Sequence, residues 1–228
     1  KLIYLFDIGC LEIDTYNGRD LWNFKAVSQN QEANDKISKI IVENSTRLPR
    51  TGSVYVMTSG NSGPKLSRVG NAGVDLEREN YTEEVISEFN HVISDLQTDN
   101  PCGRVIILEG QPGTGKSYLI RAVCKAIQSA TFIIIQPSMV SSLATPGLIQ
   151  ALINKKQDNP DAPIILIIED ADSALVTRGA DNSDSIASLL NLSDGILGIL
   201  LDNRIICSTN AVQTDIDPAI VRAGRLCR

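Results

Sequence analysis

The chain has 228 residues, of which 43% are hydrophobic and 21% are charged, enough for one sizeable core and at most two modest domains. Glycine and proline occur at ordinary frequency and no repeat is visible, so collagen-like, coiled-coil and disordered classes are excluded. The formal net charge of −6 repels phosphate backbones, and we therefore do not expect nucleic acid as a partner.

Cysteine usage and hydropathy indicate the compartment. The five cysteines are odd in number, scattered and without a C-x-x-C pair, which fits a reducing environment and offers no zinc or redox motif. No run approaches the roughly 18 continuous apolar residues of a membrane span, and the apolar residues 2–6 are too few for a signal peptide. We expect a cytoplasmic protein with no membrane span.

Residues 1–74 predict a small N-terminal region followed by a linker. Apolar, β-prone runs at residues 2–6 and 21–27 flank the turn signal Asn17-Gly18 and predict a small β or α+β element. Isoleucines within residues 37–41 are spaced as on a short amphipathic helix.

The linker is predicted at residues 59–73, which are rich in Gly, Asn and Ser around Pro64. A domain boundary is placed near residue 75, so that residues 75–228 form the second domain. Thr82 is predicted to cap a helix there, because Glu83 and the next residue are acidic and apolar residues recur on one face.

Beyond this helix, short apolar runs alternate with helix-length segments. The runs lie at residues 104–108, 131–136, 163–168 and 204–208, and the helical segments at residues 116–128, 148–156 and 185–192. Runs rich in Ile and Val without polar alternation are typical of strands buried on both faces, and intervening helices make βαβ crossovers. The expected fold class is α/β, with a parallel sheet covered by helices on both faces.

A phosphate-binding loop follows the first of these runs. The sequence Gly110 to Ser117 matches G-x-x-x-x-G-K-[ST] between a predicted strand and a predicted helix. Its glycines allow backbone N–H groups to turn toward a di- or triphosphate, Lys116 reaches the β and γ phosphates, and the Ser117 hydroxyl ligates Mg²⁺. The expected nucleotide-binding residues are Gly110, Pro112, Gly113, Thr114, Gly115, Lys116, Ser117 and the adjacent Tyr118.

Carboxylates follow a second buried strand. The run 164–168 ends in Glu169 and Asp170, at the edge where open α/β sheets bind ligands, and has the form of a Walker B element. We expect Glu169 to hold the Mg²⁺ shell with Ser117, and Asp170 to orient the attacking water or accept its proton. A turn or a helix cap is the alternative reading of the same residues.

With these motifs, residues 75–228 resemble the AAA ATPase family. Residues 205–210 are similar to its sensor-1 strand, whose terminal Asn210 helps to place the lytic water. Residues 217–228 are similar to its second region of homology, and Arg225 and Arg228 are then expected to be catalytic arginine fingers for a neighbouring subunit. The resemblance implies a P-loop NTPase fold and a ring, usually a hexamer. A plain surface charge is the alternative for either arginine.

The sequence departs from the family at several places. The usual Asp-Glu order is reversed in Glu169-Asp170. This order, together with residues 188–191 and 193–195, is similar to that of the mitochondrial AAA translocase of the folded Rieske protein. Cys227 replaces the usual acid between the two arginines. Residues 138–147 contain no aromatic residue, so threading of a chain through a pore is in doubt.

Family members continue beyond this point into a fifth strand and a helical lid, which this chain does not include. We therefore expect the natural protein to be longer. Tyr81 and Tyr118 are candidates to lie beside adenine, with ordinary packing as the alternative; ATP rather than GTP is implied by the resemblance.

The expected function is that of a Mg²⁺-dependent ATPase whose ring remodels or translocates an unidentified macromolecular partner. A low-turnover, nucleotide-dependent assembly scaffold is the alternative. A nucleic-acid loader is a third possibility, which the net charge disfavours.

Overall fold

Two compact units make up the chain, residues 1–49 and residues 50–228. The computed structural model describes residues 2–6, 9–15, 22–28, 30–44, 52–60, 63–71, 73–176, 183–193, 195–211, 215–222 and 224–227. None of the helices in these ranges is long and apolar enough to cross a membrane.

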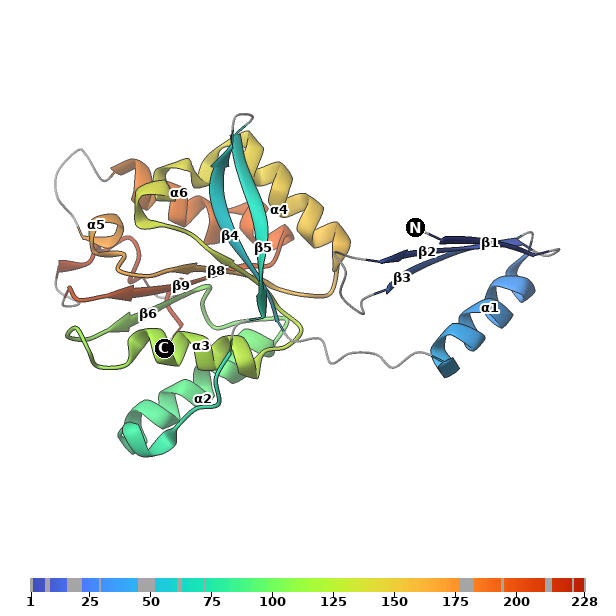
Figure 1. The fold of residues 1–228 in the computed structure, drawn as a ribbon. Helices are drawn as coiled ribbons and strands as arrows, with labels where there is room; N and C mark the ends of the chain where they lie inside the picture. The colour runs from blue at the N-terminus through green and yellow to red at the C-terminus, as the bar shows by residue number, and fades with distance from the viewer. Residues whose placement is uncertain are drawn as a thin grey trace. The chain divides into compact units, whose positions relative to one another are not determined.

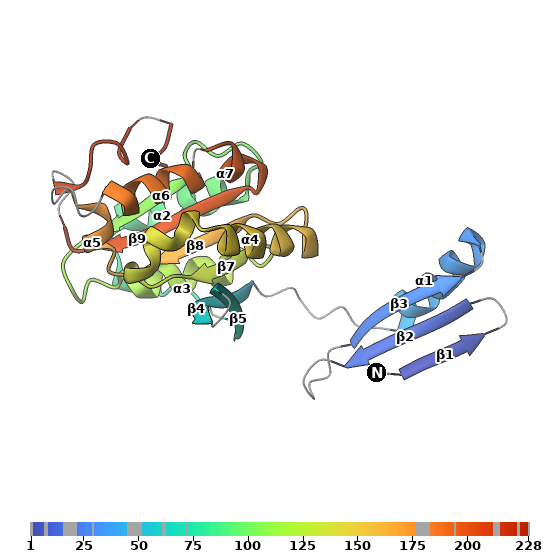
Figure 2. The same ribbon diagram turned by 90° about the horizontal axis from the view of Figure 1, so that it is seen from above.

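The first unit is a three-stranded antiparallel sheet with one helix. The strands β1 (Leu2–Phe6), β2 (Gly9–Thr15) and β3 (Trp22–Ser28) pair in that order, and α1 (Gln31–Asn44) packs against β3 (Figure 2). The predicted small α+β element is confirmed, although Asn17-Gly18 lies outside the described residues.

The second unit is built on a six-stranded sheet in the order β5-β4-β7-β8-β9-β6 (Figure 1). Its strands are β4 (Ser53–Gly60), β5 (Gly63–Asn71), β6 (Val105–Glu109), β7 (Thr131–Ile134), β8 (Ile164–Ile168) and β9 (Asn203–Thr209). All neighbouring pairs are parallel except β4 and β5. The prediction of a parallel sheet is therefore correct for most of the sheet and wrong for β5.

The hairpin of β4 and β5 replaces the predicted linker, and the compact unit begins at residue 50 rather than near residue 75. It extends the sheet because β4 pairs with β7. The strand β5 has only one neighbour, and an edge strand accepts Pro64, Lys65 and glycines that a central strand would exclude. That edge composition is what made the segment look like a loop.

Helices cover both faces of the sheet, as predicted (Figure 1). On one face lie α2 (Glu83–Gln97) and α3 (Lys116–Ala126), and on the other α4 (Pro146–Asp158), α5 (Asp172–Leu175) and α6 (Ser183–Ser193). Short 3₁₀ segments at Arg78–Asn80 and Pro137–Ala144 and the helix α7 (Ile196–Leu200) complete the unit.

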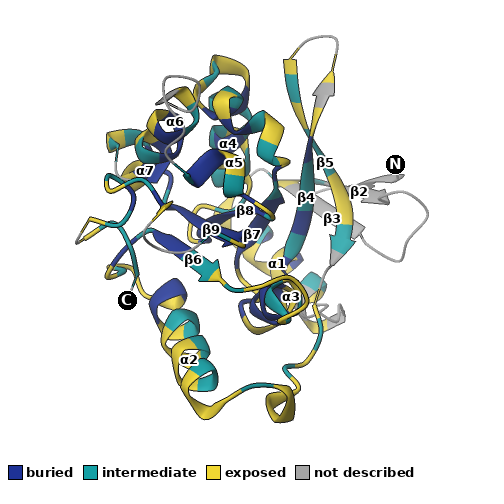
Figure 3. Ribbon diagram, turned by 90° about the vertical axis from the view of Figure 1, so that its left-hand side faces the viewer, coloured by how far each residue is buried: buried dark blue, intermediate teal, exposed yellow. Residues whose placement is uncertain are grey.

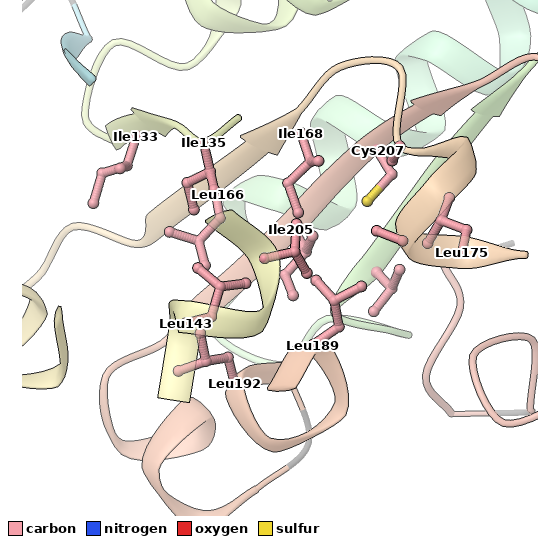
Figure 4. Close-up of a cluster of buried hydrophobic side chains, with 14 of the residues drawn as sticks. Ile133, Ile135, Leu143, Leu166, Ile168, Leu175, Leu189, Leu192, Ile205 and Cys207 are labelled. Carbon is pink, nitrogen blue, oxygen red and sulfur yellow. The ribbon is translucent and has the colours of Figure 1, made fainter. Parts of the chain in front are cut away.

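The central strands are buried on both sides, as Figure 3 shows for β7, β8 and β9. In β8, Ile164, Leu166 and Ile168 pack toward α4, α5 and α6, in the cluster drawn in Figure 4. Ile165 and Ile167 pack toward α2 and α3. Each buried Leu or Ile side chain contributes about 1.5–3 kcal/mol, so this strand holds the two helical layers together.

Two polar contacts fix α2. At its start, the Thr82 hydroxyl accepts a hydrogen bond from the Val85 N–H (3.4 Å), which confirms the predicted cap. At its end, the guanidinium of Arg204, which is 2% exposed, donates to the carbonyls of Asp95 (3.0 Å) and Thr98 (2.7 Å). Carbonyls at a helix C-terminus lack intrahelical partners, so this buried arginine anchors α2 to β9.

Candidate functional site

The carboxyl ends of β6 and β9 meet at one edge of the sheet, because these strands are parallel neighbours. The loop after β6 begins there, and the Gly110 N–H donates to the Thr209 carbonyl at the end of β9 (3.3 Å). The loop of residues 110–115 then leads directly into α3. The predicted succession of strand, glycine-rich loop and helix is therefore present.

A cleft of about 500 Å³ opens at this edge. It is lined by Pro112, Gly113, Gly115, Lys116, Ser117, Tyr118, Asp170, Ser208 and Asn210. Gly113 and Gly115 have φ angles of +84° and +91°, which only glycine adopts without strain, and they turn the loop around the cleft. The structure thus brings together most of the residues that the sequence assigned to nucleotide binding.

Two of the predicted binding residues act within the loop instead of lining this cleft. The Gly110 carbonyl accepts a hydrogen bond from the Lys116 Nζ (2.6 Å), and the Thr114 hydroxyl donates to the Gln111 carbonyl (2.9 Å). Both residues line a second, more apolar cleft of about 760 Å³ between α2, α3 and β6.

Lys116 is held entirely by uncharged oxygen atoms. Its Nζ donates to the carbonyls of Gly110 (2.6 Å) and Gln111 (3.0 Å) and to the side-chain oxygen of Asn210 (2.9 Å). Within the described part of the chain, no carboxylate lies at ion-pair distance from it. A cation so placed retains its charge for an anion in the cleft, which is what a phosphate-bearing nucleotide requires.

The two predicted acidic residues occupy different positions. Asp170 is exposed and lines the cleft, whereas Glu169 is half-buried and is not among the lining residues. The backbone of Asp170 has a φ of +51°, and its N–H donates to the Ser208 hydroxyl (3.1 Å). Asp enters this left-handed region more readily than most residues, which gives a physical reason for the short acid at this position.

Asp172, two residues beyond Asp170, has a role that the sequence motifs did not predict. Its Oδ1 accepts hydrogen bonds from the Thr209 hydroxyl and from the N–H groups of Asn210 and Ala211, each 2.9 Å long. Burial would raise the pKa of this carboxyl, but these bonds outweigh it and lower the pKa below its ordinary value. Asp172 therefore fixes the end of β9 and with it the backbone of Asn210. Its position three residues beyond Glu169 was the available signal.

Both candidate tyrosines have occupied hydroxyl groups. Tyr81 donates to the Gly115 carbonyl (3.1 Å), and Tyr118 donates to the Asp75 carbonyl (2.8 Å). Burial, the neighbouring Tyr118 and Glu77 raise the pKa of Tyr81. The two tyrosines hold the segment before α2 against the phosphate-binding loop.

The two predicted arginine fingers lie near the end of the chain. The Arg225 guanidinium donates to the Ala219 carbonyl (2.6 Å) and is not among the residues that line the cleft. Arg228 lies outside the described residues.

The donor groups suit a magnesium ion held with a nucleotide. No group of three or more His, Cys, Asp or Glu side chains in the described ranges forms a ready-made metal site. Mg²⁺ usually takes one or two protein oxygens and completes its shell with phosphate and water. The Ser117 hydroxyl and the Asp170 carboxylate share the cleft with Lys116 and are oxygens of that kind. Glu169, the predicted ligand, lies behind them.

Comparison with known proteins agrees with this site. The profile of a family described as "ATPase family associated with various cellular activities (AAA)" matches residues 106–228. The 26S proteasome regulatory subunit 6B homolog of Aspergillus niger is 28% identical over 193 residues, covering 79% of this chain and 44% of that protein. Protein CdcH of Halobacterium salinarum is 28% identical over 164 residues, covering 70% of this chain and 22% of that protein. The chain spans less than half the length of these curated relatives.

Proposed function

Because the chain belongs to the AAA family of ATPases, we propose that it binds ATP with Mg²⁺ and hydrolyses it as a subunit of a ring that remodels or translocates a macromolecular partner. The observation that carries the proposal is the contact between Lys116 and Asn210 beside Asp170, in one cleft at the end of β6 and β9. Three groups thus line the same cleft: a lysine that can bind phosphate, a side-chain amide and a carboxylate.

Each group has a role that its position supports. Lys116 and the N–H groups of the glycine-rich loop neutralise and orient the phosphates, and Ser117 is the hydroxyl that faces a bound Mg²⁺. Mg²⁺, when bound, neutralises charge on the phosphate oxygens. Asp170 is the carboxylate best placed to accept the proton of the attacking water, and Asn210 orients that water. Glu169, which does not line the cleft, would act on Mg²⁺ through the water molecules of its shell.

The ring is proposed from the arginines. In phosphoryl transfer, an arginine supplied by a neighbour stabilises the charge of the transition state. Arg225 is not among the residues that line the cleft, and its guanidinium donates a hydrogen bond to the Ala219 carbonyl. Ring formation, most simply a hexamer, places such an arginine at the next subunit's nucleotide.

A low-turnover scaffold is the second candidate. The Glu-Asp order at residues 169–170 favours it, because the residue in the cleft has the shorter carboxylate. The segment 138–147 adds to this view. It carries no aromatic residue, and its Val140 and Leu143 are buried in the core rather than offered to a substrate.

A steady-state phosphate-release assay on the full-length protein, with nucleotide binding measured in parallel, separates the two candidates. Turnover that depends on Mg²⁺ and disappears in Lys116→Ala supports the ATPase. Tight nucleotide binding with ring formation but no phosphate release supports the scaffold. Absence of nucleotide binding in the unchanged protein contradicts both.

A further inference from the structure

Cys227 occupies the place between the predicted arginine fingers where an acid is expected, and the structure shows what surrounds it. Residues 225–227 run beside the start of β6: the Val105 N–H donates to the Arg225 carbonyl, and the Cys227 N–H donates to the Val105 carbonyl, both at 2.9 Å. Side chains alternate along such a pairing. Leu226 packs in the cluster under α4–α6, whereas Cys227 packs on the opposite face, where α2 and α3 lie.

A second cysteine lies in the loop between α2 and β6. The Cys102 N–H donates to the Asp95 Oδ1 (2.7 Å), and the Cys102 side chain is exposed. The next residue, Gly103, is buried, and a Cβ atom on it would lie 2.5 Å from the Cys227 nitrogen. The backbone that carries Cys102 therefore passes directly against the backbone that carries Cys227.

The Asp95 carboxylate faces both thiols. It raises the pKa of Cys102 through hydrogen bonding and charge. Burial, with the Asp95 carboxylate, Cys102 and Glu88, raises the pKa of Cys227 to about 12. Backbone contacts and a shared carboxylate thus bring together two cysteines that are far apart in sequence.

We propose that Cys102 and Cys227 are an oxidation site, at which a peroxide converts the two thiols into an intrachain disulfide that ties the Arg225 segment to the loop before β6. The thiolate of Cys102, the more exposed residue, attacks a peroxide oxygen, the O–O bond breaks, and hydroxide leaves. Cys227 then attacks the sulfenic sulfur, forms the S–S bond and displaces water. Two thiols lose two electrons and two protons, and one hydrogen peroxide becomes two waters.

Asp95 determines how strong an oxidant is needed for this reaction. Only the thiolate reacts, and the neighbouring negative charge keeps the thiolate fraction low at neutral pH. The pair therefore stays reduced under ordinary conditions and responds to strong oxidant. Formation of the disulfide does not depend on the proposed ATPase function. The effect of the disulfide on ATP turnover does rest on that function, because the disulfide restricts the segment that carries Arg225.

The test is peptide mapping under non-reducing conditions after treatment of the full chain with hydrogen peroxide and blocking of the remaining thiols. We expect a cross-linked peptide pair that contains Cys102 and Cys227, absent from Cys102→Ser and from Cys227→Ser. Cys10→Ser, in the other unit, is the matched control and retains the cross-link. Cys124 and Cys207 are 3% and 0% exposed, and we expect them to remain unmodified.

Asp95→Asn keeps an acceptor for the Cys102 N–H and removes the charge, so disulfide formation should be faster by roughly threefold to tenfold at neutral pH. In the unchanged chain, the rate should rise by about tenfold per pH unit between about pH 7 and pH 9. This second measurement does not require the Asp95 variant to fold.

Loss of the Cys102 and Cys227 thiols without the cross-linked pair, or a cross-link only between separate chains, overturns the proposal. An unchanged phosphate-release rate after complete disulfide formation overturns only the effect on Arg225. A protein that forms the disulfide but shows no ATPase activity even when reduced supports the oxidation site and contradicts the proposed function.

Discussion

The ammonium group of Lys116 lies 2.9 Å from the side-chain oxygen of Asn210, a residue 94 positions further along the chain. This contact joins the phosphate-binding loop to the end of β9 and defines the wall of the cleft. It also fixes the orientation of the lysine side chain.

Removal of the lysine should separate binding from folding. We expect Lys116→Ala to lose about 2–5 kcal/mol of nucleotide affinity, or at least roughly 30-fold, because the phosphates lose their charged donor. The fold should be retained, since Lys116 packs in neither hydrophobic cluster. Isothermal titration calorimetry and thermal unfolding measure the two quantities. Lys125→Ala, an exposed lysine on the same helix, is the control, and equal losses in both variants would contradict the assignment.

The two acids after β8 should differ in their effects. Asp170→Asn should bind ATP but lower turnover by roughly 10²- to 10⁴-fold, the usual contribution of a general base. Glu169→Gln should chiefly raise the Mg²⁺ concentration needed for half-maximal activity. Phosphate release measured against Mg²⁺ concentration distinguishes them. The opposite pattern would exchange the roles, and equal losses would indicate shared roles.

The left-handed backbone at Asp170 should appear in stability. At a φ of +51°, alanine meets the same steric cost as aspartate but has no side chain that can form a local hydrogen bond. Asp170→Ala should therefore lower the free energy of unfolding by about 1 kcal/mol. Asp170→Gly relieves the steric cost and should be the more stable of the two variants. Urea unfolding measures the difference. A glycine variant less stable than the alanine variant would show that the conformation carries no strain.

Asp172 should contribute to stability in a pH-dependent way. Its pKa in the folded protein is below the ordinary value of 3.8, so the folded state binds fewer protons than the unfolded state. The stabilisation is therefore present above about pH 4 and is lost as the pH falls through the folded-state pKa. Asp172→Asn should unfold at lower urea than the unchanged chain at about pH 7, and the two should converge as the pH falls below 3.8 and through the lower pKa of the folded state. A constant difference over that range would count against the carboxylate as its source.

Mixing of inactive variants tests the ring. The Arg225→Ala variant retains Lys116, and the Lys116→Ala variant retains Arg225. A mixed ring therefore contains junctions between subunits at which a retained lysine meets a retained arginine. Each variant alone should lose turnover, by roughly 10³- to 10⁵-fold for an arginine supplied in trans, and the mixture should recover part of it. Arg222→Ala, an exposed arginine in the same segment, should remain active. Co-assembly by light scattering without recovery would place Arg225 within its own subunit.

The phosphate-binding loop and the buried strand β8 could be predicted from short stretches of sequence. The P-loop from Gly110 to Ser117 and the apolar strand before Glu169 could be placed because a short motif and an uninterrupted apolar run identify them. The strand β5 could not, since it is stabilised by pairing with β4 and not by its own composition.

The details of the site depend on contacts between distant segments. The left-handed backbone of Asp170 accompanies its hydrogen bond to Ser208, and the role of Asp172 requires the end of β9. Arg204 is a single charge within an apolar run, and its burial is explained by the carbonyls at the end of α2 together with the carboxylate of Asp202. The local sequence around these residues does not specify their partners in α2 or at the end of β9.

The strand order has a consequence for synthesis. Strand β9 follows the other described strands in the chain and lies between β8 and β6, so among these strands β6 and the loop that follows it have no neighbour in the sheet until β9 has inserted. At ordinary elongation rates, the 94 residues from Lys116 to Asn210 take on the order of ten seconds to emerge. During that interval the phosphate-binding loop lacks Asn210, the residue at the end of β9 that contacts Lys116. Nucleotide capture on the ribosome should therefore begin only after β9 is complete, which makes binding of ATP a marker of a finished domain.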